Sequence, residues 1–295
     1  MARKTDDRTL GGTRPCCGKR FASSNRVGVR GHLPDAASAD RILCRASNCK
    51  PRQTQSQRKV KGDRTLQRRF RESYVRMTPS LAKRLFSEWL GTAFLLTAVI
   101  GSGVMAQSLA GGNQALALLC NTLPTGAILV VLILLFSPLS GAHFNPVVSI
   151  AFAFSQDLTW TIAGLYITAQ LLGAVVGVWI SHLMFGLPMW QLSEHVRSGT
   201  GQWLAESIAT FGLLLTIFGC VARNSAAAPY AVGLYIISAY WFTSSTSFAN
   251  PAVTVARAMT DTFAGIAPSA APAFILAQIT GMLVAISVRQ WLWRI

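Results

Sequence analysis

Six long apolar segments dominate the hydropathy pattern of the chain after residue 80. They cover residues 85–106, 114–136, 160–185, 203–222, 230–248 and 272–293. Each reaches the roughly 20 residues that a helix needs to cross a hydrocarbon core about 30 Å thick. The segments lack the two-residue alternation of lipid-facing strands, and helices satisfy their own backbone in lipid. The pattern therefore predicts an all-α membrane protein with six transmembrane helices.

Charge divides the chain into two parts. Residues 1–78 carry 20 Lys and Arg against 6 Asp and Glu, whereas residues 79–295 carry only 7 against 5. A soluble domain has about 25% charged residues, and the second part has far fewer. This low charge content excludes an ordinary soluble enzyme for the second part. We expect a channel domain over residues 79–295. The first part, 1–78, is expected to be a basic, disordered extension, or a region upstream of a true start at Met77.

Most of the net charge of +16 comes from this basic extension, which also holds four of the six cysteines. The four are Cys16, Cys17, Cys44 and Cys49. Their spacing lacks the two close pairs of a usual zinc site, and aromatic residues that could stack on bases are few. We therefore expect no metal, no cofactor and no nucleic acid partner.

Lys and Arg residues flank both ends of the apolar region. Several precede the first apolar segment, including Lys83 and Arg84, and Arg289 and Arg294 end the last one. An even number of spans places both termini on one side, and basic residues favour the cytoplasmic side. We expect a multi-pass protein of the cell inner (plasma) membrane with both termini in the cytoplasm.

Three short motifs occur twice, in the same order and 105 to 118 residues apart. They are Glu88-Trp-Leu-Gly-Thr92 with Glu206-Ser-Ile-Ala-Thr210, Asn145-Pro-Val-Val with Asn250-Pro-Ala-Val, and Tyr166-Ile-Thr-Ala-Gln170-Leu-Leu-Gly173 with Phe274-Ile-Leu-Ala-Gln278-Ile-Thr-Gly281. The chain thus consists of two halves, about 81–185 and 203–295, with three spans each. Three is odd, so the second half must enter the membrane from the opposite face. Such an inverted 3+3 repeat places its binding site near the midplane.

Each half carries an Asn-Pro pair after its second span. Asn is a good N-cap and Pro suits the first helical position, so Asn145-Pro146 and Asn250-Pro251 each predict a helix start. Helices ending near residues 155 and 260 would be about 15 Å long, half the hydrocarbon core. We expect two re-entrant half-helices whose N-termini meet. Their positive ends would repel cations and admit neutral molecules that carry an acceptor oxygen.

The loops Ser140-Gly-Ala-His143-Phe-Asn145-Pro146-Val147 and Ser247-Phe-Ala-Asn250-Pro251-Ala252-Val resemble the two signature loops of the major intrinsic protein family, the aquaporins and glycerol channels. The resemblance extends from about Leu81 to Ile295. It implies that Glu88 and Glu206, together with His143, brace the re-entrant loops, and that the protein forms a homotetramer. Taken alone, a Glu within a span would also fit a proton-coupling site.

Two departures from the family pattern bear on selectivity. The first motif has Val147 in place of Ala, and Val253 stands where water channels of the family usually carry Arg. By ungapped counting, the resemblance implies a selectivity filter of Thr125, Ser238, Ser247 and Val253, all small or uncharged. Arg257, one turn beyond Val253, is a candidate for an outer-mouth charge, although a surface or interface position suits it equally. Because it lacks the filter Arg, the chain resembles bacterial members of the family that are associated with uncharged metalloids.

Together these features predict a passive channel for small neutral solutes: glycerol-like polyols, urea, or uncharged metalloid species such as arsenite and methylated arsenicals, together with water. A proton-coupled secondary transporter also uses inverted repeats and broken helices, and it remains an alternative. A water-selective aquaporin is a second alternative. No catalytic cluster is recognisable among His143, His182, Glu88 and Asp157, so we do not expect an enzyme.

Overall fold

The computed structural model of the chain describes residues 79–293, so the predictions for residues 1–78 and for Arg294 lie outside the described residues. Within the described range every regular element is helical. The elements are α2 (Leu81–Leu109), α3 (Gln114–Ser140), α4 (Pro146–Phe154), α5 (Trp160–Phe185), α6 (Thr200–Arg223), the 3-10 helix η1 (Ser225–Ala227), α7 (Ala228–Phe242), α8 (Pro251–Arg257) and α9 (Ala271–Trp293). The structure thus confirms the predicted all-α fold.

Local sequence signals set the helix boundaries. The side chains of Ser80, Asn113 and Thr159 each cap a helix by accepting a backbone N–H of the first turn. Gly141 ends α3 and Gly186 ends α5, with φ of 92° and 65° in the left-handed region that glycine adopts most readily. The chain therefore turns sharply where the sequence offers glycine.

Five helices are long and apolar enough to cross a membrane: α2, α3, α5, α6 and α9. The fifth predicted segment, residues 230–248, was predicted too long, because α7 stops at Phe242 after 15 residues. The hydroxyl of Thr243 donates to the Ala239 carbonyl, and the chain then passes through Thr246 and Ser247 with φ of 62° and 48°. The polar run after Phe242 thus ends the helix and opens the loop that leads into α8.

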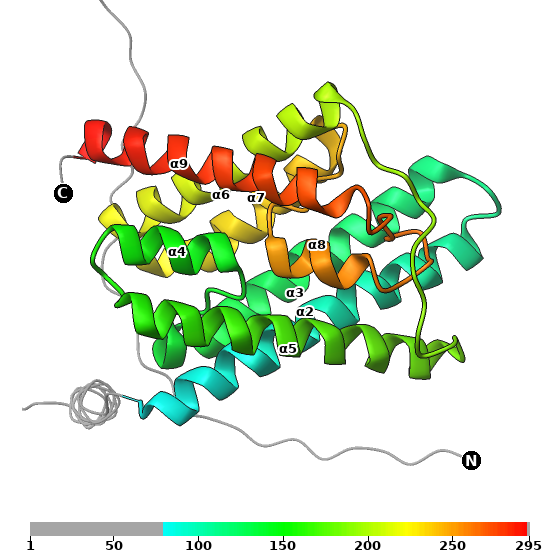
Figure 1. Cartoon of the computed structure of the whole chain (residues 1–295), viewed down its shortest axis with the longest axis horizontal. Helices are drawn as coiled ribbons and strands as arrows, with labels where there is room; N and C mark the ends of the chain where they lie inside the picture. Colours follow the sequence, from blue (N-terminus) through cyan, green and yellow to red (C-terminus); the bar gives the residue numbers. More distant parts are fainter. Residues whose placement is uncertain (1–78, 294–295) are drawn as a thin grey trace, which may run out of the picture. The chain divides into compact units, whose positions relative to one another are not determined.

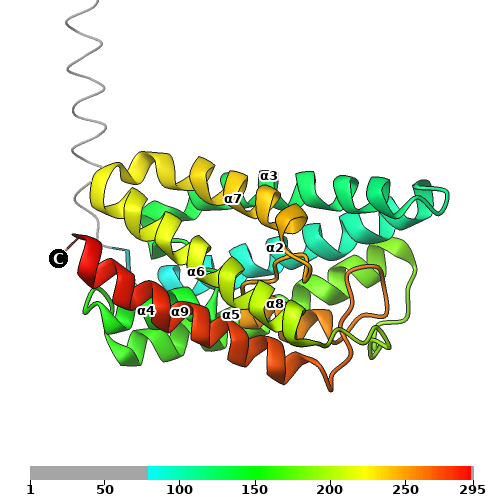
Figure 2. The same cartoon turned by 90° about the horizontal axis from the view of Figure 1, so that it is seen from above.

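The two halves of the chain pack in the same way. α2 packs along α5 in the first half, and α6 packs along α9 in the second, as Figures 1 and 2 show. A Cβ at Gly173 would overlap the backbone oxygen of Trp89, and a Cβ at Gly281 would overlap that of Ser207. The glycines of the repeated Ala-Gln-x-x-Gly motif therefore allow the same close helix contact in both halves.

The two short helices link the halves. Figure 1 shows α4 and α8 end to end between α5 and α9. Each packs on both of those long helices, so each touches its own half and the other half. The half-helices were predicted to reach about residues 155 and 260. α4 ends at Phe154, close to its predicted end, whereas α8 is shorter and ends at Arg257.

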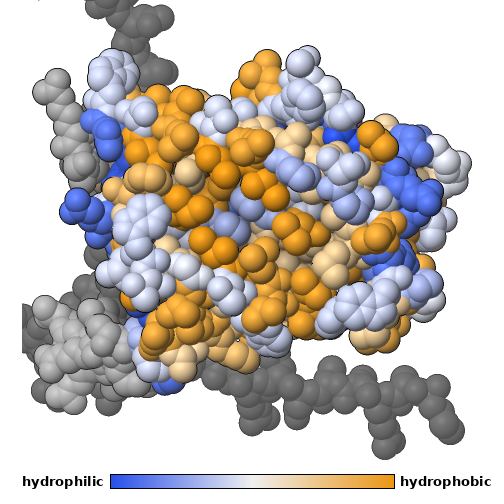
Figure 3. All heavy atoms as spheres, viewed as in Figure 1, coloured by the Kyte–Doolittle hydropathy of each residue, from blue (hydrophilic) through white to orange (hydrophobic). Residues whose placement is uncertain are grey.

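The outer surface matches a bilayer environment. In Figure 3, hydrophobic side chains cover the middle of the visible face, and the hydrophilic ones gather at the two ends of the helices. Large apolar side chains such as Phe94, Leu135 and Leu172 are exposed along the middle of α2, α3 and α5. An exposed apolar surface of this extent is stable in lipid rather than in water.

Candidate functional site

The N-termini of α4 and α8 are capped by the two predicted Asn residues. Asn145 Oδ1 accepts the N–H of Val147 at 3.1 Å, and Asn250 Oδ1 accepts the N–H groups of Ala252 at 2.9 Å and Val253 at 3.3 Å. Each Asn precedes a Pro at the first helical position, where the missing N–H costs nothing. The Asn-Pro sequence therefore starts each half-helix within the buried interior.

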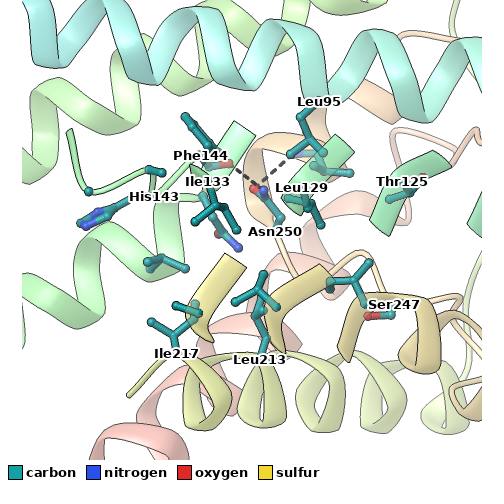
Figure 4. Close-up of a pocket in the computed structure, with 18 of the residues that line it drawn as sticks. Leu95, Thr125, Leu129, Ile133, His143, Phe144, Leu213, Ile217, Ser247 and Asn250 are labelled. Atoms are coloured by element: carbon teal, nitrogen blue, oxygen red, sulfur yellow. Dashed lines mark hydrogen bonds between the residues drawn. The ribbon is translucent and has the colours of Figure 1, made fainter. Parts of the chain in front are cut away.

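The same two Asn side chains join the halves through a reciprocal pair of hydrogen bonds. Asn145 Nδ2 donates to the Ala249 carbonyl, and Asn250 Nδ2 donates to the Phe144 carbonyl, both at 2.8 Å. Figure 4 shows the contact between Asn250 and Phe144 at the centre of the site. An amide nitrogen carries two hydrogens, so each Nδ2 retains one donor for a molecule in the cavity. The half-helices thus meet N-terminus to N-terminus, with donors at the junction.

Glu88 lies behind the first loop and accepts four hydrogen bonds. The Ser140 hydroxyl and the His143 N–H donate to Oε1 at 2.6 and 2.9 Å, and the Phe144 N–H and Gln170 Nε2 donate to Oε2 at 2.7 and 2.8 Å. Glu88 is fully buried. A buried carboxylate needs such donors, so it holds the loop in one conformation.

Glu206 occupies the equivalent place behind the second loop. It accepts the N–H groups of Phe248 and Ala249 at 2.8 and 2.9 Å and Gln278 Nε2 at 2.8 Å. Gln278 also donates to the Thr254 hydroxyl, just as Gln170 donates to that of Ser149 in the first half. This geometry is what a bracing role for Glu88 and Glu206 requires. The sequence analysis noted the two Gln residues only as repeat markers.

A cavity of about 250 Å³ runs beside the junction of α4 and α8. Asn145, Asn250 and His143 supply polar groups to its wall, while aliphatic side chains from α2, α3, α6 and α7 supply most of the rest (Figure 4). The aliphatic residues include Leu95, Val99, Leu129, Ile133, Val148, Leu213, Ile217, Val221, Val232 and Ile236. The described lining contains no Asp or Glu. The cavity is therefore lined mainly by apolar side chains, with a smaller number of hydrogen-bonding groups.

Three of the four proposed filter residues line this cavity: Thr125, Ser247 and Val253. Figure 4 places Thr125 and Ser247 on the same side of Asn250, away from His143. The Thr125 hydroxyl donates to the Asn121 carbonyl at 2.9 Å. The Ser247 hydroxyl is buried and has no hydrogen-bond partner among the described residues.

The structure does not bring Ser238 into the cavity, which corrects that part of the filter. Ser238 is exposed on the outer side of α7, whereas Ile236 and Tyr240 are buried and line the cavity. Residues four apart share a helix face, and a residue midway between them points away. The ungapped count from Asn250 therefore missed by two residues, because the α7 residues on either side of Ser238 in this spacing, Ile236 and Tyr240, face the cavity. Tyr240 is the α7 residue nearest that loop in the lining, so this wall of the cavity is aromatic rather than small.

The structure places Val147 and Arg257, the two other residues singled out in the sequence, in different surroundings. Val147 is fully buried in an apolar cluster with residues of α6 and α9, and it does not line the cavity. Arg257 is only 2% exposed, lines the cavity and lies over the Phe248 ring at 3.5 Å. Its Nε donates to the Ala264 carbonyl. Arg257 is thus not on the outer surface of the protein, where an interface could form. It is a buried cation at the cavity wall.

His143 faces the cavity at the other end. Its Nδ1 lies 3.1 Å from the Ser149 hydroxyl, and its ring packs against Phe152 with centroids 4.9 Å apart. Next to it, Tyr166 donates to the Ser140 carbonyl and accepts from Arg84 Nε, both at 2.8 Å. The sequence analysis noted Tyr166 only as the start of a repeated motif, where Phe274 is its equivalent and lacks the hydroxyl, and it noted Arg84 only as a basic residue before the first span. Within residues 79–293, no group of three His, Cys, Asp or Glu side chains is placed to hold a metal ion.

Comparison with known sequences agrees with this architecture. Residues 76–248 match the family model described as major intrinsic protein. The chain is 50% identical over 212 residues to a protein named aquaglyceroporin AqpS from Rhizobium meliloti, covering 72% of this chain and 91% of that one. It is 33% identical to a probable aquaporin NIP4-2 from Arabidopsis thaliana, covering 56% of this chain and 60% of the plant protein.

Comparison with solved structures supports the fold. The crystal structure of an aquaglyceroporin from Plasmodium falciparum superposes with a TM-score of 0.58 and 22% sequence identity. The match covers 72% of this chain and 95% of that one. At this identity the likeness concerns the fold alone.

Proposed function

The chain belongs to the major intrinsic protein family, and on that premise we propose that it passively conducts small neutral solutes larger than water, together with water itself. Its family and its spanning helices make it a multi-pass membrane protein and a channel for small solutes, not an enzyme. The finer proposal concerns which solutes pass. It rests chiefly on the cavity beside the paired Asn residues, whose wall has hydrogen-bond donors and no carboxylate.

The absence of carboxylates from the described lining favours a channel over a coupled transporter. A proton- or sodium-coupled transporter needs a titratable or ion-binding group that its pathway can reach. Glu88 and Glu206 are the carboxylates within the spans, and each accepts three or four hydrogen bonds away from the cavity. Their equivalent places in the two halves suit a structural brace. Flux should therefore be independent of pH and of a sodium gradient.

The cavity wall that contains Ser247 and Val253 favours solutes larger than water. Val253 places an aliphatic side chain where water-selective relatives carry Arg, and the guanidinium of Arg257 lies one turn further along α8, over the Phe248 ring. We propose glycerol-like polyols, urea and uncharged metalloid hydroxides as the permeant class. The name aquaglyceroporin, carried by the Rhizobium meliloti relative, is in line with this size range. In the proposed filter Tyr240 replaces Ser238, beside Thr125, Ser247 and Val253.

The proposal for assembly and orientation is supported by the same family and by the charge distribution. We propose a homotetramer in the inner (plasma) membrane, with one pathway in each protomer and both termini in the cytoplasm. Channel families of this kind bury apolar surface between protomers, and the exposed apolar faces of the long helices are suited to it. Lys and Arg at both ends of the apolar region support the cytoplasmic assignment.

Stopped-flow light scattering of proteoliposomes tests the proposal. Vesicles holding the full chain would be mixed with glycerol, urea, arsenite at neutral pH, or sucrose, with empty vesicles as the reference. We expect faster entry of the first three solutes, no entry of sucrose, and rates that do not change with pH or sodium. Uptake that requires a proton or sodium gradient would instead show a coupled transporter, and water flux alone would show a water-selective channel.

A further inference from the structure

The end of the cavity near Ser247 contains two buried donors without partners. Ser247 Oγ and Arg257 Nη1 both lack a hydrogen-bond partner among residues 79–293, and both residues line the cavity. They are 2% exposed each. Leaving such donors unsatisfied in a dry interior is costly, so buried polar groups of this kind normally have a partner. Both atoms have almost no accessible surface, so the two residues line the cavity through their other atoms.

The two cations at this end have no ion-pair partner among the described residues. Arg197 lies over the same Phe248 ring as Arg257, at 5.4 Å, so two guanidinium groups approach one aromatic side chain. Arg197 donates to the carbonyls of Gly265 and Phe263, which are neutral acceptors. Burial lowers the pKa of Arg197, as expected for a cation that lacks a carboxylate partner.

The nearest braced carboxylate does not fill this role. Glu206 already accepts from Phe248, Ala249 and Gln278, and it is not part of an ion pair with either Arg. The positive ends of α4 and α8 also point at the cavity from the junction. Two guanidinium groups thus lie near this end against the single carboxylate of Glu206, so the balance of charge is positive.

We propose that Ser247 and Arg257, with the added charge of Arg197, form a binding site for a small monovalent oxyanion at this end of the cavity. The ligand class is a small carboxylate or sulfonate that has one to three heavy atoms besides its acid oxygens. Its oxygens would lie against the Arg257 guanidinium and the Ser247 side chain, both of which line the cavity. A guanidinium is suited to such groups because its planar donors match two oxygens of one anion.

A bound oxyanion would occupy the path that neutral solutes use, so it should inhibit their flux competitively. This consequence rests on the proposed function, whereas binding itself does not. The cations repel other cations at the same place, so an organic cation of similar size should have no effect. The site thus gives the cavity two distinct responses, conduction of neutral molecules and retention of anions.

Methanesulfonate is a suitable probe, because it is a small oxyanion that stays ionised at all practical pH values and cannot cross the bilayer as a neutral acid. Two readouts would be taken on the full chain: calorimetric binding in detergent, and inhibition of glycerol flux in proteoliposomes with the probe on both sides. Tetramethylammonium chloride at equal ionic strength is the ion control. Arg223→Gln is the protein control, since Arg223 is exposed at the opposite end of α6.

We expect saturable binding in the wild type and in Arg223→Gln. In Arg257→Gln, affinity should fall by about tenfold or more, because a charge-assisted bond is lost while a side-chain amide remains. Arg197→Gln should lose only about two- to threefold, since it contributes charge without contact. Arg257→Lys keeps the charge and serves if the Gln variant does not fold. Arg257→Lys should bind methanesulfonate more tightly than Arg257→Gln does, but more weakly than the wild type.

Equal affinity in the wild type and in the Arg257 variants, or no saturable binding, would overturn the proposal. Binding without any glycerol flux would leave the anion site standing and would contradict the proposed function instead. Glycerol flux without binding or inhibition would do the reverse. An equal effect of tetramethylammonium would show a general salt effect and would also count against the site.

Discussion

The two halves of the channel share a buried frame but differ in what they present to the cavity. Each half has a Glu that accepts backbone N–H groups from its loop, a Gln that donates to that Glu, and an Asn that bonds across to the other half. The cavity-facing residues differ. His143 packs on Phe152 in the first half, whereas Phe248 lies under Arg257 in the second.

These two pairs occupy equivalent positions in the repeat. His143 and Phe248 are 105 residues apart, as are Phe152 and Arg257, the same spacing as Asn145 and Asn250. In the first half the basic residue, His143, is on the loop and the aromatic residue, Phe152, is on the half-helix. In the second half the aromatic residue, Phe248, is on the loop and the basic residue, Arg257, is on the half-helix. The frame positions the backbone, and the exchanged pairs give the two ends of one cavity different chemistry. Stability should thus depend on the frame and selectivity on the lining.

Removing a frame carboxylate should have the largest effect. Glu88→Ala leaves four buried donors unsatisfied, and Glu206→Ala leaves three. At about 1 kcal/mol or more for each donor, the Glu88 variant should lose roughly 4 kcal/mol and fail to fold or assemble. Thermal unfolding followed by circular dichroism in detergent would measure this, with exposed Glu194→Ala as the control. A fully stable Glu88→Ala protein would show that the carboxylate does not hold the loop.

Changing the junction should reduce conduction strongly without preventing folding. Asn250→Asp keeps the cap on α8, but it replaces the amide that donates to the Phe144 carbonyl and adds a negative charge between two positive helix ends. We expect glycerol flux to fall by about tenfold or more, or cation leak to appear, since one to two kcal/mol changes a rate by that order. Asn145→Asp should behave alike.

The control for this change is Asn113→Asp, which makes the same substitution at the exposed N-cap of α3. Proteoliposome flux of glycerol and of sodium would be measured for all three variants. Unchanged glycerol selectivity in both Asn145→Asp and Asn250→Asp would mean that these side chains do not line the path.

Altering a lining residue should change selectivity by a smaller factor. Tyr240→Ala removes a buried ring from the cavity wall, so the entry of solutes bulkier than glycerol should rise by about threefold, a free-energy difference of less than 1 kcal/mol. Ser238→Ala should change nothing, because Ser238 is exposed on the outer face of the same helix. Relative rates for erythritol and glycerol would measure both variants. The opposite result, an effect of Ser238→Ala alone, would restore the ungapped filter.

Removing the basic extension should have the smallest effect. The repeat motifs and the described helices all lie after residue 78, so a chain of residues 77–295 should fold and conduct glycerol at the full-length rate. Size-exclusion chromatography and vesicle swelling would compare the two proteins at equal reconstitution density. Failure of the shorter chain to fold or conduct would assign residues 1–76 a necessary role.

The sequence predicted the frame well, because the frame is what the repeat duplicates. Glu88, Glu206, Asn145 and Asn250 stand out as pairs at equivalent positions, and the structure places all four at the loops. The lining was harder to predict. Ser238 was placed by counting along the chain, whereas the structure turns Ile236 and Tyr240 of the same helix toward the cavity. One residue of register on a helix rotates a side chain by about 100°, so counting fails there.

The burial of Arg257 could not be predicted for a different reason. Its position one turn beyond Val253 was evident, but the sequence offers no carboxylate partner that would mark it as an interior residue. The structure places it against the Ala264 carbonyl, the face of Phe248 and the cavity, and leaves its Nη1 without a hydrogen-bond partner among the described residues. Cation–aromatic contacts and backbone carbonyls leave no pattern in sequence, because they join segments whose spacing is set by the loops.

The most direct test of the account compares an Arg introduced at two equivalent positions. Val148 and Val253 are 105 residues apart in the repeat, and both line the cavity. The ratio of glycerol to water permeability would be measured by stopped flow for Val253→Arg and Val148→Arg. We expect the ratio to fall by about tenfold in Val253→Arg, where the guanidinium meets Tyr240 and Ser247, and by about threefold at most in Val148→Arg. An unchanged ratio in Val253→Arg, or equal falls in both variants, would contradict a selectivity filter at the Ser247 end of the cavity.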